Sequence, residues 1–327
     1  MKTKILGTGS NLPDRVLTNA DLEKIVDTTD EWIVSRSGIR ERRIASSDDS
    51  ASTLTMPAIE RALERAHLSP QDIDAIIIGT ITPDMFFPST ACILQKKLGC
   101  RRIPCFDLSA GCTGFVYSLV IADSLIRTKG FKNILVVGVE VLSKITNWDD
   151  RGTCVLFGDG AGAAILGRTE DDDPSGLMGS FLSADGTFAK LLEMPAGGSR
   201  LPASEKTVKE NLHTIKMLGN ETFKAAVRAM EEASLEGLKS AGLEISELDW
   251  LIPHQANIRI IEFTAKRLKM PMDKVVITLD KYGNTSASSV PIALDEAFSS
   301  GRIKPGQTVL LVAFGAGFTW GSVVFRA

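Results

Sequence analysis

Apolar residues along the chain recur with two periods, which predict alternating helices and strands. Segments 55–68 (TMPAIERALERAHL) and 223–243 (FKAAVRAMEEASLEGLKSAGL) have apolar residues at the three- and four-residue spacing of an amphipathic helix. Each precedes a short apolar run typical of a buried strand, and a second strand then leads through a glycine-bearing turn into another helix. Strands that alternate with helices predict parallel pairing and sheets covered on both faces.

Two pairs of similar segments are separated by the same number of residues along the chain. LSPQDIDAIIIGT at 68–80 resembles LEISELDWLIPHQ at 243–255, and KNILVVGVE at 132–140 resembles QTVLLVAFG at 307–315. Both pairs are separated by 175 residues. A shared offset indicates an internal duplication, whereas chance matches between apolar strings would not agree.

The chain is therefore predicted to be a layered α/β protein of two similar halves, residues 1–170 and 171–327. The boundary is placed in TEDDDPSG, where charge, proline and glycine follow the apolar segment 158–167 (GDGAGAAILG). That segment formally fits a dinucleotide-binding glycine pattern, but AAILG continues it as a strand and not as a phosphate-capping helix. We therefore expect no nicotinamide or flavin cofactor.

Composition narrows the functional classes. A hydrophobic fraction of 44%, a charged fraction of 24% and a net charge of -3 are typical of a globular protein and argue against nucleic-acid partners. The first residues, MKTKILGTGSNLP, lack the apolar run of a signal peptide, and no run approaches the ~20 apolar residues that span a bilayer. A cytoplasmic protein without membrane contact is expected.

The cysteines do not predict disulfides or a metal site. Five cysteines without a CxxC pair, together with only three histidines, argue against zinc, and a reducing cytosol argues against disulfides. Cys92, Cys100, Cys105 and Cys154 lie in or beside apolar segments and are interpreted as small packing residues. Cys112 differs because of the elements around it.

Three polar residues follow predicted strands. Cys112 stands between a strand and the first turn of a long helix, where free N–H groups and the helix dipole are expected to stabilise a thiolate. His254 follows the strand DWLIP, and Asn284 follows VVITLDKYG. Ligands of α/β sheets gather at the carboxyl ends of strands. Each residue alone is more often structural, but three matching placements predict a site.

The motifs around these residues resemble a known family. AGCTGF, PHQAN and YGNTSASSVP, with WIVSRSGIRERR, FGDGAGA and FGAGFTWGS, are similar to the β-ketoacyl-acyl carrier protein synthase III branch of the thiolase superfamily. The resemblance extends from Lys4 to the C-terminus. It implies two related halves stacked in a five-layered α-β-α-β-α arrangement, in agreement with the duplication.

The resemblance implies a decarboxylative Claisen condensation that initiates type II fatty acid synthesis. Cys112 would take the acyl group of a short-chain acyl-CoA, with the backbone N–H groups of Cys112 and Ala316 as oxyanion donors. His254 and Asn284 would then stabilise the enolate that forms when malonyl-acyl carrier protein loses carbon dioxide. Ala316 replaces a glycine of several relatives, and its N–H remains a donor unless the turn requires positive φ. No metal or other cofactor is implied.

The resemblance also assigns coenzyme A contacts. Trp32 and Arg151 would hold the adenine, with Arg36 near the phosphates. Without the resemblance, Arg151 is interpreted as an exposed loop residue. The matched pantetheine-tunnel residues are Phe223, Ala256 and Asn257.

Acyl carrier protein would dock on basic residues. Arg259, Lys266 and Arg267 are spaced by seven and eight residues on one predicted helix, and Lys224 adjoins the tunnel. Such a patch would steer an acidic carrier, although a charged helix face is often merely solvated.

Family members are homodimers, and FFPSTACIL matches a segment that crosses the interface. Phe87 would then close the partner's acyl pocket and limit the primer to short chains. The loop 196–216 receives no assignment.

Three alternatives stay open. AGCTG nearly fits the nucleophile elbow of a cysteine hydrolase of the α/β-hydrolase type. A non-enzymatic carrier-binding protein would also use the basic patch, and a related condensing enzyme of secondary metabolism would share every motif. The sequence does not distinguish an acetyl primer from a branched one.

Overall fold

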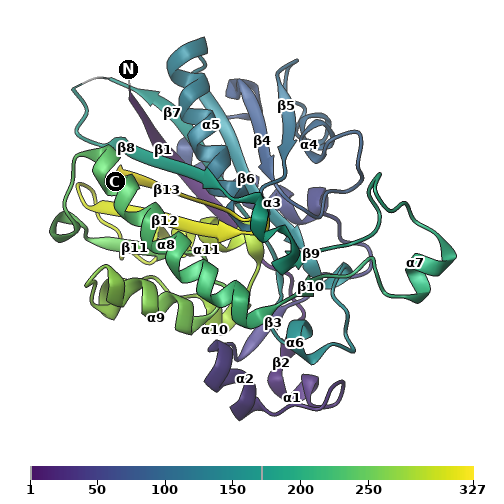
Figure 1. The fold of residues 1–327 in the computed structure, drawn as a ribbon. Helices are drawn as coiled ribbons and strands as arrows, with labels where there is room; N and C mark the ends of the chain where they lie inside the picture. The colour runs from purple at the N-terminus through teal and green to yellow at the C-terminus, as the bar shows by residue number, and fades with distance from the viewer. Residues whose placement is uncertain (1, 171) are drawn as a thin grey trace.

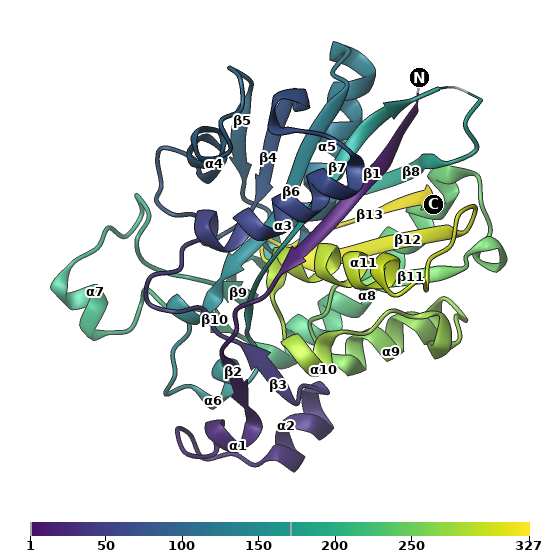
Figure 2. The same ribbon diagram turned by 180° about the vertical axis from the view of Figure 1, so that it is seen from behind.

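The computed structural model describes residues 2–170 and 172–327, which form two mixed sheets and the helices around them (Figures 1 and 2). The first sheet has the order β1-β7-β6-β4-β5, and the second has the order β11-β12-β13-β8. The strands of the first sheet are β1 (Lys2–Asn11), β4 (Ala75–Gly79), β5 (Cys105–Leu108), β6 (Asn133–Val141) and β7 (Asp159–Thr169). Those of the second are β8 (Gly176–Ala184), β11 (Trp250–Pro253), β12 (Thr308–Gly315) and β13 (Thr319–Arg326).

Short strand pairs and the helices complete the chain. The pairs are β2 (Val16–Thr18) with β3 (Glu41–Arg43) and β9 (Leu192–Glu193) with β10 (Lys216–Met217). The helices are α1 (Asn19–Leu22), α2 (Asp30–Ser37), α3 (Ala51–Ala66), α4 (Thr90–Leu98), α5 (Gly114–Lys129), α6 (Arg151–Cys154), α7 (Glu205–Lys209), α8 (Gly219–Ala241), α9 (Ile258–Arg267), α10 (Leu279–Tyr282) and α11 (Ser289–Ser299). Two 3-10 turns matter for the site, η2 (Gly111–Thr113) and η7 (Ser286–Ser288).

The two sheets repeat one arrangement, as the shared sequence offset predicts. β4 pairs parallel with β6, which is followed by the antiparallel strands β7 and β1. In the same way β11 pairs parallel with β12, which is followed by the antiparallel strands β13 and β8. The counterpart of β5 in the second sheet is reduced to one residue, Val275, which forms a parallel bridge with Leu251 of β11. The predicted duplication is therefore present in the fold.

The expectation of parallel pairing is correct only for β4 with β5 and β6 and for β11 with β12. β13 follows β12 after three residues, and a parallel crossover needs about a dozen. The connection is too short to return the chain to the starting edge, so the two strands must run antiparallel. The predicted boundary between residues 170 and 171 lies between β7 and β8 and stays a prediction.

Alternation along the strands produces the five layers. Ile76 and Ile78 of β4 pack in a core with α3, whereas Ile77 packs in the central core with α5 and α11. On the second sheet Leu311 faces that central core, and Leu310 joins the outer core beneath α8 and α9. Figures 1 and 2 show α3 outside the first sheet and α8 and α9 outside the second. Because side chains of a strand alternate between faces, each sheet buries both of its faces.

The cysteines follow the sequence interpretation with one exception. All five are free thiols, and Cys100, Cys112 and Cys154 are buried while Cys105 is partly buried. Cys92 is exposed, so its assignment as a packing residue is wrong. It lies in α4, and its thiol is placed 3.7 Å from the Cys105 carbonyl of the edge strand β5, outside the core that Ala91 and Leu94 join.

Candidate active site

Cys112 lies between β5 and α5, as predicted. It is the middle residue of η2, directly before the 16-residue helix that begins at Gly114. The preceding Gly111 has a φ of 54°, and a Cβ there would lie 2.8 Å from the backbone nitrogen of Ala316. Glycine is therefore required for both the conformation and the close approach of the two segments.

The backbone of β12 ends against this turn. A Cβ on Gly315 would lie 2.5 Å from the backbone nitrogen of Cys112, so the N–H groups of Cys112 and Ala316 belong to adjoining segments. The positive φ of this turn falls on Gly317, at 139°, and not on Ala316. The alanine therefore fits without the conformation that only glycine tolerates.

The resting thiol differs from the expected thiolate. Burial raises the pKa of Cys112 to about 12, and the negative charge of Glu140 contributes to this rise. A hydrogen bond with the Ser286 hydroxyl acts in the opposite direction but is outweighed. The side chain is only 9% exposed, and loss of hydration disfavours the charged form. The expected lowering of the pKa at the helix N-terminus is therefore not found, and acylation needs a group that accepts the proton.

His254 directly follows β11 and is fully enclosed. Its Nδ1 lies 2.6 Å from the Ser289 hydroxyl, and its ring contacts Phe314 edge-on with centroids 5.5 Å apart. The other nitrogen, Nε2, is buried and has no hydrogen-bond partner in the described structure. Burial lowers the pKa of His254 to about 3, so the imidazole is neutral at physiological pH.

Asn284 follows the helix α10 and not a strand, because only Val275 of the predicted strand VVITLDKYG pairs with a neighbouring strand. The residue is held by the backbone around it. Its N–H donates to the carbonyl of Leu156 at 2.8 Å, and its carbonyl accepts from Gly158 at 3.0 Å. Its side-chain Oδ1 accepts from the Ser286 N–H at 2.9 Å. Because the oxygen is occupied, the amide nitrogen is the end of the side chain that can donate to a ligand.

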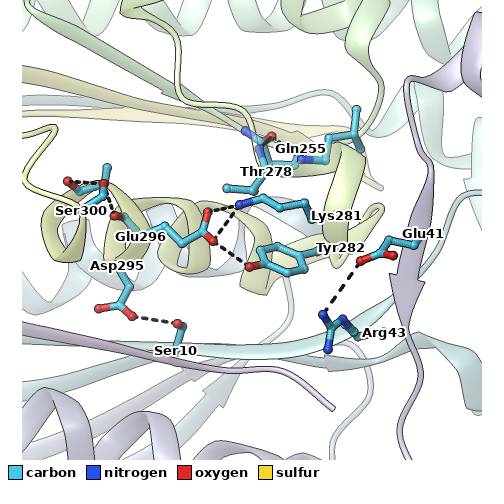
Figure 3. Close-up of polar contacts among 12 residues, drawn as sticks. Ser10, Glu41, Arg43, Gln255, Thr278, Lys281, Tyr282, Asp295, Glu296 and Ser300 are labelled. Carbon is cyan, nitrogen blue, oxygen red and sulfur yellow. Dashed lines mark hydrogen bonds and ion pairs between the residues drawn. The ribbon is translucent and has the colours of Figure 1, made fainter. Parts of the chain in front are cut away.

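Gln255 joins the segments that carry His254 and Asn284. Its Oε1 accepts from the N–H groups of Thr278 and Leu279, and its Nε2 donates to the carbonyls of Pro253 and Val276. The start of α10 is thereby tied to the end of β11 (Figure 3).

The end of α10 is anchored to α11. Lys281 contacts the Glu296 carboxylate at 2.9 Å, and the Tyr282 hydroxyl donates to it at 2.7 Å (Figure 3). Both contacts lie just before the turn that carries Asn284. The two anchors together fix that turn relative to His254.

A cavity of about 220 Å³ opens beside the sulfur of Cys112. Ser286 and Ala316 line it together with Cys112, and most of its other walls are apolar. These apolar residues are Ile81, Leu142, Ile145, Phe157, Leu192, Met194 and Ile215. Its size and apolar lining suit a short acyl chain.

The unassigned loop 196–216 now has a structural role. It connects β9 with β10, projects α7 away from the rest of the molecule (Figures 1 and 2), and inserts Ile215 into the cavity wall. The Ile215 N–H donates to the carbonyl of Ile145, another wall residue. The loop therefore completes the pocket whose walls the strand ends begin.

Two site residues were missed by the sequence reasoning, Ser286 and Glu140. Ser286 lies within the quoted NTSASS turn but was not singled out. Glu140 ends an apolar strand segment, and a lone acid at the end of such a run was the available signal. Its carboxylate is fully buried and accepts a hydrogen bond from Ser286 at 3.2 Å.

The residues assigned to coenzyme A come together only in part. The guanidinium of Arg36 lies 5.0 Å from the centroid of the Trp32 ring, and that of Arg151 lies 4.8 Å from it. Asn257 uses its Oδ1 to cap α9 and its Nδ2 to bond the Arg36 carbonyl, so both ends of its amide have structural contacts. Phe223 packs edge-on against Phe263. Ala256 is buried in the outer core.

The four basic docking residues are exposed but do not form a uniform stripe. Arg259 lies over the ring of Phe223 at 5.4 Å, and Arg267 pairs with Glu231 of α8 at 3.4 Å. Lys224 is the basic residue next to Phe223, and Lys266 lies in the last turn of α9. The basic charges therefore gather where α8 and α9 adjoin.

Phe87 is 85% exposed, and Phe86 beside it is 80% exposed. This segment leads into α4, which lies beside β5, the edge strand of the first sheet. Large exposed aromatic side chains near an unpaired edge strand are typical of an interface.

The described ranges, 2–170 and 172–327, hold neither a metal-binding cluster nor a membrane-spanning helix. No cluster of three or more histidine, cysteine or acidic side chains there is arranged to hold a metal ion. No helix in that part of the chain combines the length and apolar character needed to cross a membrane.

Comparison with known proteins identifies the family. The family model of 3-oxoacyl-[acyl-carrier-protein] synthase III matches residues 106–186, and the model of its C-terminal part matches residues 238–327. Beta-ketoacyl-[acyl-carrier-protein] synthase III of Caldanaerobacter subterraneus subsp. tengcongensis is 59% identical over 98% of this chain and 97% of its own.

Solved structures agree with this result. The crystal structure of 3-oxoacyl-[acyl-carrier-protein] synthase III from Aquifex aeolicus VF5 superposes with a TM-score of 0.92 and 47% identity, covering 99% of this chain and 100% of that one. The priming beta-ketosynthase of the R1128 polyketide pathway gives a TM-score of 0.90 at 34% identity, covering 99% and 96%. The thiolase-like fold is thereby confirmed, and the α/β-hydrolase alternative required another fold. The chain belongs to the 3-oxoacyl-[acyl-carrier-protein] synthase III family of condensing acyltransferases.

Proposed function

We propose that the protein condenses a short acyl group from acyl-CoA with malonyl-acyl carrier protein, giving 3-ketoacyl-acyl carrier protein, carbon dioxide and free CoA. The acyl group is acetyl or a branched short chain, and the product starts type II fatty acid synthesis in the cytoplasm. The observation that supports this proposal is the neutral, enclosed His254 with an unpartnered Nε2. Its ring contacts Phe314, and the next residue, Gly315, adjoins the backbone of Cys112.

In the first half-reaction Cys112 attacks the thioester carbonyl. The N–H groups of Cys112 and Ala316 stabilise the negative oxygen of the tetrahedral intermediate, and the apolar cavity holds the acyl chain. CoA leaves, and the acyl group remains on the sulfur. The adenine enters between Trp32 and Arg151 by displacing their stacking contact of 4.8 Å, with Arg36 beside the phosphates.

In the second half-reaction malonyl-acyl carrier protein loses carbon dioxide. The enolate oxygen accepts hydrogen bonds from His254 Nε2 and from the amide nitrogen of Asn284. A neutral imidazole that carries its proton on Nε2 can donate this hydrogen bond. Because decarboxylation yields the enolate directly, no strong base is needed. The enolate carbon then attacks the acyl-cysteine. These steps use protein groups alone.

The proposed function also requires two partners, an acyl carrier protein and a second copy of the chain. The acidic carrier protein docks on Lys224, Arg259, Lys266 and Arg267 near the junction of α8 and α9. The protein forms a homodimer across the β5 edge, and Phe87 closes the partner's acyl pocket. Priming of a secondary-metabolite pathway is the second candidate, because a polyketide-priming relative shares the fold at 34% identity.

Intact-protein mass spectrometry tests this function. Wild-type protein is incubated with acetyl-CoA and then with malonyl-acyl carrier protein, beside Cys112→Ser. We expect an acetyl adduct on Cys112 that disappears as acetoacetyl-acyl carrier protein forms, and no adduct on the serine variant. His254→Ala and Asn284→Ala are expected to accept the acetyl group but to leave malonyl-acyl carrier protein intact. Loss of the adduct as free acetate, with the malonyl carrier untouched, would contradict the proposal.

A further inference from the structure

Glu140 is a wholly buried carboxylate next to the nucleophile. It is 0% exposed, although it lies near the end of a strand that otherwise carries apolar side chains. Its oxygens accept hydrogen bonds from the Thr82 hydroxyl at 2.6 Å and the Ile81 N–H at 3.2 Å. Burying a carboxylate is costly, so a buried acid that the fold retains calls for a function.

Ser286 connects this carboxylate to Cys112. Its hydroxyl donates to Glu140 Oε1 at 3.2 Å, so its oxygen can accept from the thiol of Cys112, which lines the same cavity. Its N–H holds Asn284, and its φ of 50° is unusual for a residue other than glycine. Strained backbone of this kind persists where the surrounding structure fixes a side chain in place.

We propose that Ser286 and Glu140 form a proton relay for Cys112, in which Ser286 contacts the sulfur and Glu140 acts through Ser286. The inference rests on the proposed function, because it concerns the acylation step of that reaction.

The relay balances the protons of acylation. As the Cys112 S–H bond breaks, its proton passes to Ser286 Oγ, and the Ser286 proton passes to Glu140 Oε1. The cysteine sulfur forms its bond to the thioester carbon, and the bond from that carbon to the CoA sulfur breaks. The proton on Glu140 then returns through Ser286 to the departing CoA sulfur. Ser286 and Glu140 thereby regain their original protonation states.

The other titratable groups nearby are poorer acceptors. Glu193, which also lines the cavity, is paired with Lys190 at 3.1 Å. Burial lowers the pKa of His254 to about 3, and its Nδ1 already contacts Ser289. Burial raises the pKa of Glu140 to about 7, which suits a base that works near neutral pH. On β7, Gly160 lies opposite Glu140, and the neighbouring Asp159 accepts hydrogen bonds from Ser143 and the Ala45 N–H.

Alkylation of Cys112 by iodoacetamide tests the relay without any acyl substrate. The rate is measured between pH 5.5 and 9 on the full-length protein, and peptide mass spectrometry separates Cys112 from the exposed Cys92. In the wild type we expect the rate to rise through an inflection near pH 7, where Glu140 loses its proton. Glu140→Gln and Ser286→Ala should lose this inflection and react at least about tenfold more slowly at pH 8.

If Glu140 acted only through its negative charge, Glu140→Gln would change the alkylation rate in the opposite direction. Its negative charge raises the pKa of Cys112, so Glu140→Gln would then lower that pKa and speed alkylation. Faster alkylation of this variant, or an inflection that both variants retain, would overturn the relay. Glu140→Asp keeps the acid and should restore the inflection at a reduced rate. If Glu140→Gln does not fold, Ser286→Ala and Glu140→Asp test the same claim.

The result is independent of the condensation assay. An inflection that depends on Glu140, in a protein that does not condense acetyl-CoA with malonyl-acyl carrier protein, would support the relay and refute the proposed function. Normal condensation with alkylation that is indifferent to Glu140 would leave the function standing and refute the relay.

Discussion

The hydroxyl of Ser289, the first residue of α11, lies 2.6 Å from Nδ1 of His254 at the end of β11. When this hydroxyl donates to Nδ1, the imidazole proton resides on Nε2, the nitrogen that has no protein partner. The contact therefore selects the tautomer that can donate to an enolate oxygen. An α11 side chain thus sets the chemistry of a residue 35 positions earlier in the chain.

Ser289→Ala is expected to slow decarboxylation of malonyl-acyl carrier protein by up to about 100-fold, the size of losing one oxyanion donor. Acylation of Cys112 should be unchanged, because His254 has no part in that step. Carbon dioxide release and acyl-enzyme formation are measured separately. Ser300→Ala is the matched control, since that hydroxyl bonds only to backbone carbonyls at the end of α11. Equal losses in both steps would contradict the tautomer role.

His254 makes stability depend on pH in the acidic range. Its pKa is 6.5 in a free chain and about 3 in the folded protein, so between these values only the unfolded chain binds the proton. Stability from this group is full above pH 6.5 and decreases as the pH falls, by about 2 kcal/mol between pH 6.5 and 5.

Urea unfolding of the wild type and of His254→Gln at both pH values isolates this contribution. Glu140 acts with the opposite sign, since its raised pKa of about 7 makes stability fall as the pH rises from 4.5 to 7. Because both proteins retain Glu140, its effect cancels in the difference. A difference between them that does not change with pH would refute the prediction.

Gly315→Ala should disable acylation. The new Cβ would lie 2.5 Å from the Cys112 nitrogen and 3.1 Å from the Ala110 oxygen, both backbone atoms that cannot rotate away. The two oxyanion N–H groups would separate, and we expect the acylation rate to fall by about 100-fold or more. Burst formation of the acyl-enzyme measures it. Gly198→Ala is the control, because its Cβ meets nothing within 4 Å, and it should acylate normally.

Arg151→Ala should weaken acyl-CoA binding without affecting catalysis. Losing the proposed stacking of Arg151 on the bound adenine, worth about 0.5–2 kcal/mol, raises the KM for acyl-CoA by about 3- to 30-fold. The kcat and the KM for malonyl-acyl carrier protein should stay constant, because Arg151 stacks on Trp32 at the start of α6 and does not line the cavity. Arg127→Ala, which removes a comparably exposed arginine on α5, serves as the control. A fall in kcat would place Arg151 nearer the chemistry than its stacking implies.

The sequence by itself determined the layered fold and the positions of Cys112 and His254 at strand ends, whereas Asn284 follows the helix α10 and not the predicted strand. Both conclusions depend on local information. Apolar periodicity follows from which face of an element is buried, and the two matches at one offset record the duplication directly. The motif resemblance then supplied the chemistry of these residues.

Only the tertiary structure decided the protonation states and the residues that support the site. The pKa of Cys112 is high because distant segments remove its water and place the Glu140 charge beside it, which outweighs the opposite effect of Ser286. The helix N-terminus that the sequence predicts would lower the pKa of Cys112. Burial raises it, and burial depends on contacts between distant segments that sequence spacing does not encode. Ser289 and Gln255 act across gaps of 35 and 23 residues, which only the packing of α10 and α11 against β11 closes. The loop 196–216 likewise gained a role only when the fold brought Ile215 to the cavity.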